Sequence, residues 1–229
     1  MFMQQYFYDV KLKLNDIIPL GKDTLYHIKK VLRKGNDYIF RIADKSRKIY
    51  KCKLVDDNAQ VIEELDENNE LDVNITAILA LFKNDKYELC IQKLVELGVN
   101  RIVPFEAERS VVKGSSNKRE RLCKIAREAA EQSHRNIIPE ITDTIKLKDL
   151  DKYMSENNYI AYESENVLNS QFNVGSSISY IIGPEGGFSD IEYEKIKELG
   201  FNSISLGKRI LRAETAAIYM TSVIVSKIQ

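Results

Sequence analysis

From residue 75 onward, short apolar runs alternate along the chain with segments that have the length and pattern of helices. Continuous apolar runs are typical of strands buried on both faces, and amphipathic segments between them are typical of helices that cover such a sheet. The expected strands are 75–82, 101–105, 159–162, 180–182 and 201–206, and the expected helices are 86–97, 117–133, 189–199 and 213–228. This order predicts an α/β domain with a largely parallel sheet and helices on both of its faces.

The N-terminal part follows a different pattern, in which apolar and polar residues alternate and turn residues separate the segments. This period of two is typical of short strands. The expected strands are 5–10, 38–42, 50–54 and 61–65, and one short helix is expected from Asp23 to Leu32, ended by Gly35. We therefore expect a small, mostly β domain at residues 1–72 and an α/β domain at 73–229, divided in the polar stretch 66–70.

The charge of the chain is balanced in total but uneven along the sequence. The 34 basic and 34 acidic side chains cancel, which argues against a protein that coats DNA. Residues 109–135 contain eight Lys or Arg and three Glu, whereas residues 56–70 contain seven acids and no base. Because local patches set the affinity for RNA, the neutral total leaves RNA binding open.

Cysteine and histidine usage bounds the chemistry and the compartment. The chain has three widely spaced cysteines, Cys52, Cys90 and Cys123, and only two histidines, His27 and His134. No pair has the spacing of metal ligands, so we expect a reducing compartment and no structural zinc. No segment resembles a signal peptide or could span a bilayer, which predicts a cytoplasmic protein without a membrane partner.

Two glycine-containing loops carry most of the functional information. Residues 183–189 and 206–216 each follow an expected strand and lead into an expected helix. Open α/β sheets bind ligands at the C-terminal ends of their strands, where helix starts offer unpaired N–H donors. The alternative is a pair of tight turns that need glycine for structural reasons. A dinucleotide-dependent oxidoreductase and a P-loop NTPase are disfavoured, because their glycine motifs are missing.

Several motifs point to one family. The two loops read GPEGGFS at 183–189 and LGKRILRAETA at 206–216. The further motifs are HxxxVLR at 27–33, QKLVELG at 92–98, ExERS at 106–110 and EAAEQSxR at 128–135. Together they resemble the RsmE family of 16S ribosomal RNA uridine-N3 methyltransferases, of the SPOUT superfamily, over essentially the whole chain.

The resemblance implies an N-terminal PUA-like domain that binds RNA and a SPOUT-type α/β domain with a trefoil knot near the C-terminus, a rare exception to unknotted topology. It implies S-adenosyl-L-methionine as the cofactor, a homodimer with the active site at its interface, and 16S ribosomal RNA or the small ribosomal subunit as the partner. The implied function is methylation of N3 of a specific uridine in 16S ribosomal RNA. Two alternatives stay open: another RNA target within the superfamily, or a non-catalytic RNA-binding factor in ribosome assembly.

The resemblance also assigns site residues. The expected cofactor residues are Leu79, Gly183, Pro184, Glu185, Gly186, Gly187, Leu206, Gly207, Ile210, Leu211, Thr215 and Ala216. Leu206, Ile210 and Leu211 fit ordinary core packing equally well. Arg212 is expected to stabilise negative charge on the deprotonated uracil, and Glu214 is either a general base or a brace for Arg212 and the helix start.

Basic and polar side chains are candidates for contact with RNA. These are Arg33, Lys93, Arg109, Arg127, Gln132, Arg135 and Arg209. The alternative for a surface arginine is a solvated ion pair, such as Arg127 with Glu131 one helical turn away. Gln5 departs from the family pattern, since many relatives have an arginine there. The helix expected at 213–228 is apolar around most of its circumference, which predicts burial against the sheet and against a second subunit.

Overall fold

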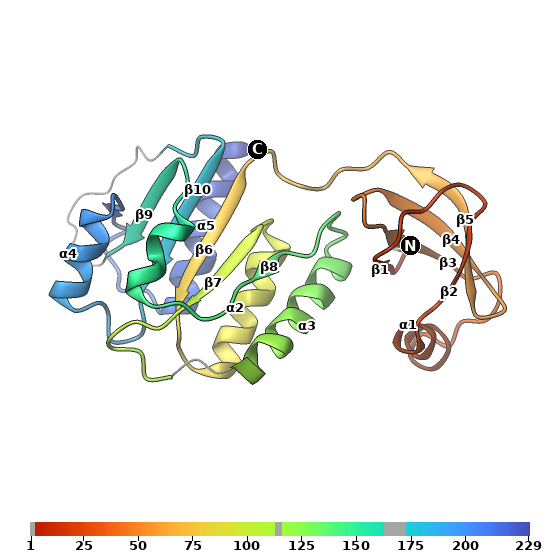
Figure 1. The fold of residues 1–229 in the computed structure, drawn as a ribbon, viewed down its shortest axis with the longest axis horizontal. Coiled ribbons are helices and arrows are strands. Elements are labelled where there is room, and N and C mark those ends of the chain that lie inside the picture. The colour runs from red at the N-terminus through yellow and green to blue at the C-terminus, as the bar shows by residue number, and fades with distance from the viewer. Residues whose placement is uncertain (1–2, 113–115, 163–172) are drawn as a thin grey trace. The chain divides into compact units, whose positions relative to one another are not determined.

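The computed structural model describes residues 3–112, 116–162 and 173–229. The chain divides into two compact units (Figure 1). The first consists of Met1–Glu70 with Ala130–Ile137, and the second consists of Leu71–Ala129 with Ile138–Gln229. The N-terminal segment of the first unit ends at Glu70, in the polar stretch 66–70. The sequence did not predict that residues 130–137 belong to the first unit as well.

A five-stranded sheet forms the first unit, in the order β1-β3-β4-β5-β2. Its strands are β1 (Gln5–Phe7), β2 (Ile17–Pro19), β3 (Ile39–Ala43), β4 (Ile49–Val55) and β5 (Asn58–Leu65). β1 pairs with β3 in parallel, and the other neighbours are antiparallel. Asp56 and Asp57 join β4 to β5 with φ values of 46° and 69°. Two successive positive φ values are those of a type I′ turn, whose twist matches that of a hairpin.

The alternating residues of these strands fill the core of the first unit, where Phe40, Ile42 and Leu54 are fully buried. The expected helix is α1 (Lys22–Tyr26), which continues as the π-helical turn η1 (His27–Val31). η1 ends at Val31, one residue before the predicted end at Leu32, and the chain leaves the helix at Arg33, which has a φ of 54°, rather than at the predicted stop residue Gly35. The chain turns one residue after Leu32, and the N–H of Lys34 then donates to the carbonyl of Ile28 at 2.9 Å.

Buried polar contacts attach the segment Ala130–Ile137 to the first unit. The side chain of Arg135, 3% exposed, forms an ion pair with Glu70, which is 12% exposed. The Glu70 carboxylate also accepts from the N–H of Asn136 at 2.8 Å. Gln5 donates from Nε2 to the Arg135 carbonyl at 2.6 Å, so this departure from the family pattern is a buried structural residue.

The second unit contains a six-stranded sheet in the order β11-β9-β10-β6-β7-β8. Its strands are β6 (Asn74–Ala80), β7 (Arg101–Phe105), β8 (Glu140–Ile141), β9 (Asn157–Ala161), β10 (Ser177–Ile182) and β11 (Asn202–Ile204). All five neighbouring pairs are parallel. The α/β class with a parallel sheet, expected from the alternation of apolar runs and helices, is therefore confirmed.

Helices cover both faces of this sheet (Figure 1). They are α2 (Asn84–Glu96), α3 (Ser116–Gln132), the 3-10 helix η2 (Leu147–Tyr153), α4 (Asp190–Glu198) and α5 (Ala213–Ile228). Neighbouring residues of β10 face opposite sides of the sheet: Ile181 packs in one core with residues of α4 and η2, whereas the hydroxyl of Tyr180 is 2.6 Å from Thr221 Oγ1 on α5. Within the described ranges, no helix is long and apolar enough to cross a membrane.

The helices and strands expected in the second unit are present with small shifts at their ends, and α5 has the bounds that the sequence predicted. The sequence missed β8 and η2, which are too short to show a clear period. It also missed β2 in the first unit, where Pro19 obscures the strand pattern.

Candidate functional site

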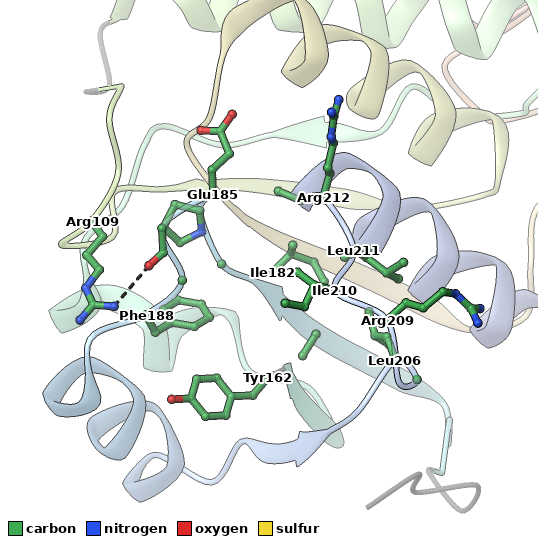
Figure 2. A pocket seen from close by; sticks show the side chains of 18 of the residues that line it. Arg109, Tyr162, Ile182, Glu185, Phe188, Leu206, Arg209, Ile210, Leu211 and Arg212 are labelled. Atoms are coloured by element: carbon green, nitrogen blue, oxygen red, sulfur yellow. Dashed lines mark hydrogen bonds between the residues drawn. The ribbon is translucent and has the colours of Figure 1, made fainter. Parts of the chain in front are cut away.

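A cavity of about 470 Å³ lies where β9, β10 and β11 end in the second unit. Its size is in the range of small-molecule sites. It is lined by Arg109, Ala161, Tyr162, Ile182, Gly183, Pro184, Glu185, Gly186, Gly187, Phe188, Asp190, Leu206, Gly207, Arg209, Ile210, Leu211, Arg212, Ala213 and Ala216. The two glycine-containing loops thus meet at one site, together with Ala161 and Tyr162 at the end of β9 (Figure 2).

The loop at 183–189 is shaped by close packing at its start and a helix cap at its end. A Cβ on Gly183 would lie 2.8 Å from Cε2 of Phe188, so only glycine lets the chain turn over this buried ring. Ser189 is the N-cap of α4, and its Oγ accepts from the N–H of Glu192 at 3.2 Å. A Ser followed three residues later by a Glu is a typical sequence pattern at a helix N-terminus.

The loop after β11 turns at Gly207 and leads into α5. Gly207 has a φ of 114°, a conformation that a side chain would strain. Its N–H is 3.3 Å from Ser205 Oγ. Arg212 is extended at the N-cap of α5, and the helix begins at Ala213. The first turn of α5 therefore faces the cavity, where Ala213 and Ala216 line it.

The predicted cofactor residues line the cavity except for two. Leu79 is fully buried in β6, and Thr215 lies on the exposed side of the first turn of α5. Neither is among the lining residues, and their contact with a cofactor stays a prediction from the resemblance. Ile210 is 83% exposed, which rules out the alternative of core packing for this residue in the single chain.

Sequence reasoning missed part of the lining. Tyr162, directly after β9, stacks on Tyr193 of α4 with ring centroids 3.9 Å apart. The available signal was the end of the expected strand at 159–162, since parallel strands end at one edge of a sheet. The other lining residues outside the prediction are Ala161, Ile182, Phe188, Asp190 and Ala213.

The two expected catalytic residues have different positions. Arg212 lines the cavity and is exposed. Glu214 does not line it; its Oε1 lies 3.6 Å from Lys86 Nζ on α2. Its Oε2 is buried and has no hydrogen-bond partner among the described residues. This position fits a brace between α5 and α2 better than a general base.

A further loop approaches the cavity after β7. Glu108 and Arg109 follow this strand, and the guanidinium of Arg109 donates from Nη1 to the carbonyl of Gly186 at 3.3 Å. Glu192 Oε1 accepts from the N–H of Glu108 at 3.1 Å. Burial raises the pKa of Glu192, whose Oε2 has no partner in the described part of the chain. Arg109, expected to contact RNA, is thus a lining residue of the cavity.

The remaining candidates for RNA contact differ in exposure. Arg135 is a correction: it is 2% exposed and paired with Glu70, so its guanidinium is not available to a phosphate. Lys93 is part of an ion pair with Glu96, at 2.9 Å from both carboxylate oxygens. The exposed candidates are Arg33, Arg127, Gln132 and Arg209, of which Arg209 lines the cavity.

None of the described residues that line the cavity is a cysteine. Cys90 is fully buried on α2, and burial, together with the charge of Glu214, raises the pKa of its thiol to about 12. Burial raises the pKa of Cys52 to about 12 as well. Both thiols are protonated at neutral pH, and a protonated thiol is a poor nucleophile. Among the described residues, no group of His, Cys, Asp and Glu could hold a metal ion.

Comparison with known proteins gives a consistent result. A family model described as RNA methyltransferase domain matches residues 69–225. Ribosomal RNA small subunit methyltransferase E of Mesomycoplasma hyopneumoniae is 38% identical over 225 residues, covering 94% of this chain and 96% of the relative. The protein of the same name from Bacillus subtilis is 35% identical over 248 residues, covering 97% and 96%.

Solved structures agree with the sequence relatives. The crystal structure of a ribosomal RNA small subunit methyltransferase E from Neisseria gonorrhoeae, bound to S-adenosyl methionine, has a TM-score of 0.91 at 27% identity. It covers 99% of this chain and 98% of that one. The matches extend over both units and include both glycine-containing loops. The chain therefore belongs to the RNA methyltransferase family whose members include ribosomal RNA small subunit methyltransferase E.

Proposed function

We propose that the protein is an S-adenosyl-L-methionine-dependent methyltransferase that methylates N3 of a uridine in 16S ribosomal RNA. The observation that carries the proposal is the meeting of both glycine-containing loops in one cavity of about 470 Å³. Family membership supports the reaction class, and the relatives named for the small ribosomal subunit support the RNA. The reaction belongs to the cytoplasm, where ribosomes are made.

The cavity fits this cofactor in shape and in chemistry. Loop backbone around Gly183 and Gly187 comes close to the cavity, where peptide groups can hold an adenosine by hydrogen bonds. Ile182, Leu206 and Leu211 provide apolar surface suited to an adenine ring. When bound, S-adenosyl-methionine supplies an activated methyl group on its sulfonium. The protein must hold the acceptor nitrogen in line with that group, and alignment alone is worth several kcal/mol.

Arg212 is the residue proposed to act on the acceptor. N3 of uracil is a weak nucleophile until it loses its proton, and the resulting negative charge is shared with the neighbouring oxygens. A guanidinium at the cavity edge stabilises this charge as it develops. The uridine must be unpaired or flipped out, because pairing occupies N3. Glu214 is proposed as a positioning residue that holds the start of α5 through Lys86.

A homodimer is part of the proposal, supported by the two sides of α5. One side is buried, with Ala217, Met220 and Ile224 at most 1% exposed. On the other side, Tyr219 is 48% exposed, and Val223, one turn further along the helix, is partly exposed. A second copy would cover this surface. Light scattering should give twice the chain mass; a monomer at micromolar concentration would contradict the dimer.

The first unit is proposed as a PUA-like RNA-binding domain, and the second unit is proposed to contain a trefoil knot near the C-terminus. Both proposals rest on family membership and on the similarity to the Neisseria structure over nearly the whole chain. The proposed RNA contacts are Arg33, Arg127, Gln132 and Arg209, because all four are exposed. Lys93 stays a weaker candidate, since an RNA phosphate would compete with Glu96.

Mapping of 3-methyluridine in ribosomal RNA tests the function. Methylation at N3 blocks the pairing edge of uracil, so reverse transcription stops at the modified nucleotide. A strain without the gene should lose one such stop in 16S ribosomal RNA. The wild-type gene should restore it, and a gene encoding Arg212→Met should not. An unchanged pattern in 16S ribosomal RNA, or a loss confined to transfer RNA, would refute the proposed target.

A further inference from the structure

Arg109 is a charged residue of the cavity, and among the described residues its guanidinium makes one hydrogen bond. Its Nη1 donates to the carbonyl of Gly186 at 3.3 Å. No carboxylate among the described residues lies within ion-pair distance of its guanidinium, which has five N–H donors in a planar fork. A planar fork that borders a cavity and has unused donors is suited to a carboxylate, which it can bind through two parallel hydrogen bonds.

Reciprocal hydrogen bonds hold the backbone on which Arg109 stands. Ser189 Oγ donates to the carboxylate of Glu108 at 2.5 Å. In the other direction, the N–H of Glu108 donates to Oε1 of Glu192 at 3.1 Å. Since Ser189 also caps α4, the loop after β7 and the loop after β10 are fixed to each other directly beside Arg109. The arginine is therefore placed by rigid neighbours.

Apolar side chains and the Arg109 guanidinium lie on different sides of the cavity (Figure 2). Leu206 and Leu211 lie on one side, near Arg209, whose side chain points away from them. Arg109 lies on the opposite side, beside Phe188, and Arg212 extends toward a third direction. A ligand with an apolar ring at one end and an anionic group at the other would therefore place its anionic end beside Arg109.

We propose that Arg109 binds the α-carboxylate of the methyl donor and so fixes the amino-acid end of the cofactor. The inference rests on the proposed function, because it assigns one end of the proposed ligand to one residue. It replaces the RNA contact expected for Arg109 from the sequence. A carboxylate that enters the cavity gives up part of its hydration, and a hydrogen-bonded cationic partner compensates for this loss. Arg109 supplies that partner without a change in the loops.

Two ligands that differ at this end test the assignment by calorimetry on the purified full-length chain. S-adenosylhomocysteine has the amino-acid end, and 5′-methylthioadenosine lacks it. Arg109→Met keeps the apolar stem and removes the charge, whereas Arg109→Lys keeps the charge and loses the fork. Lys208→Met is the matched control, because Lys208 is exposed in the neighbouring loop and does not line the cavity.

We expect Arg109→Met to weaken the binding of S-adenosylhomocysteine by about 10- to 100-fold, as the loss of a charge-assisted hydrogen bond predicts. The affinity for 5′-methylthioadenosine should change by less than about threefold, and Arg109→Lys should recover part of the loss. Lys208→Met should leave both affinities unchanged. Equal weakening of the two ligands would overturn the assignment. So would unchanged affinities with lost RNA methylation, which would assign Arg109 to the RNA. Failure of the wild-type chain to bind either ligand would refute the proposed function itself.

Discussion

Substitution of Glu70 by glutamine should destabilise the first unit strongly. The Glu70 carboxylate accepts from Arg135 Nη2 at 2.5 Å and from Arg135 Nε at 3.2 Å. It also accepts from the N–H groups of Asn136 at 2.8 Å and Ile137 at 3.3 Å. Glu70→Gln removes the charge and turns an amide N–H₂ toward these donors, while the Arg135 side chain remains 3% exposed.

The size of the effect follows from burial. Breaking a buried ion pair by removing one partner costs about 3–5 kcal/mol, because the remaining charge stays buried without compensation. For a chain of this size, each kcal/mol corresponds to about 2–4 °C in melting temperature. We therefore expect a loss of about 6–20 °C in Glu70→Gln. Replacing both partners, as in Glu70→Leu with Arg135→Met, should cost less than the single change, since no buried charge remains.

Hydrogen exchange measured by mass spectrometry is the suitable assay, since it reports on each unit separately. Peptides from residues 3–70 and 130–137 should exchange faster in Glu70→Gln, and peptides from 173–229 should change little. Glu64→Gln is the matched control in the same unit, because Glu64 pairs with Lys48 on the surface at 47% and 55% exposure. If Glu70→Gln were no more destabilising than Glu64→Gln, the structural role given to this ion pair would be wrong.

Three further changes test the loops of the cavity. Gly183→Ala would bring a Cβ to 2.8 Å from the Phe188 ring, which should lower the free energy of unfolding by about 1–3 kcal/mol. The same change should weaken the binding of S-adenosylhomocysteine, and an unchanged affinity in calorimetry would contradict this. Burial raises the pKa of Glu192 above 4.5, so the wild type should lose stability as the pH rises through the folded-state pKa. Glu192→Gln should lack this loss, and parallel melting curves for the two proteins against pH would refute it. Ser189→Ala should cost about 1 kcal/mol through the lost helix cap and should weaken S-adenosylhomocysteine, whereas Ser189→Asn keeps an acceptor for the cap and a donor for Glu108. Equal affinities in these two variants would exclude a positioning role for the serine.

Local patterns were sufficient for most of the second unit. The helix α5 was predictable because Ala213–Ile228 contains neither Gly nor Pro and is apolar over most of its length. The start of α4 was predictable because Ser189 is a good N-cap that stands three residues before Glu192. Both loops could be placed at one edge of the sheet because each follows a buried strand. These conclusions depend on residues close together in the sequence.

Local patterns could not identify partners that are distant in the sequence. Arg135 looks like an exposed base in a basic segment, and only the fold brings Glu70 against it. Arg109 and Tyr162 are far from both glycine loops along the chain, and the parallel strand order brings them to the cavity. Glu214 shows the same limit, since its position depends on how α5 packs against α2. The spacing of Arg212 and Glu214 alone could not decide whether Glu214 is a general base or a positioning residue.

The first unit is built from two separate segments of the chain, and this limits when it can fold during synthesis and where the chain can be cut. The β-rich N-terminal stretch leaves the ribosome first, but its counter-ion for Glu70 and its acceptor for Gln5 are made only with Arg135. Until Arg135 emerges, the Glu70 carboxylate and the side-chain amide of Gln5 lack these partners. A fragment that ends at residue 72 would lack Arg135 permanently, so the N-terminal segment should not fold stably when it is expressed alone. Joining 130–137 to it through a short linker is the simplest way to obtain it as an independent domain.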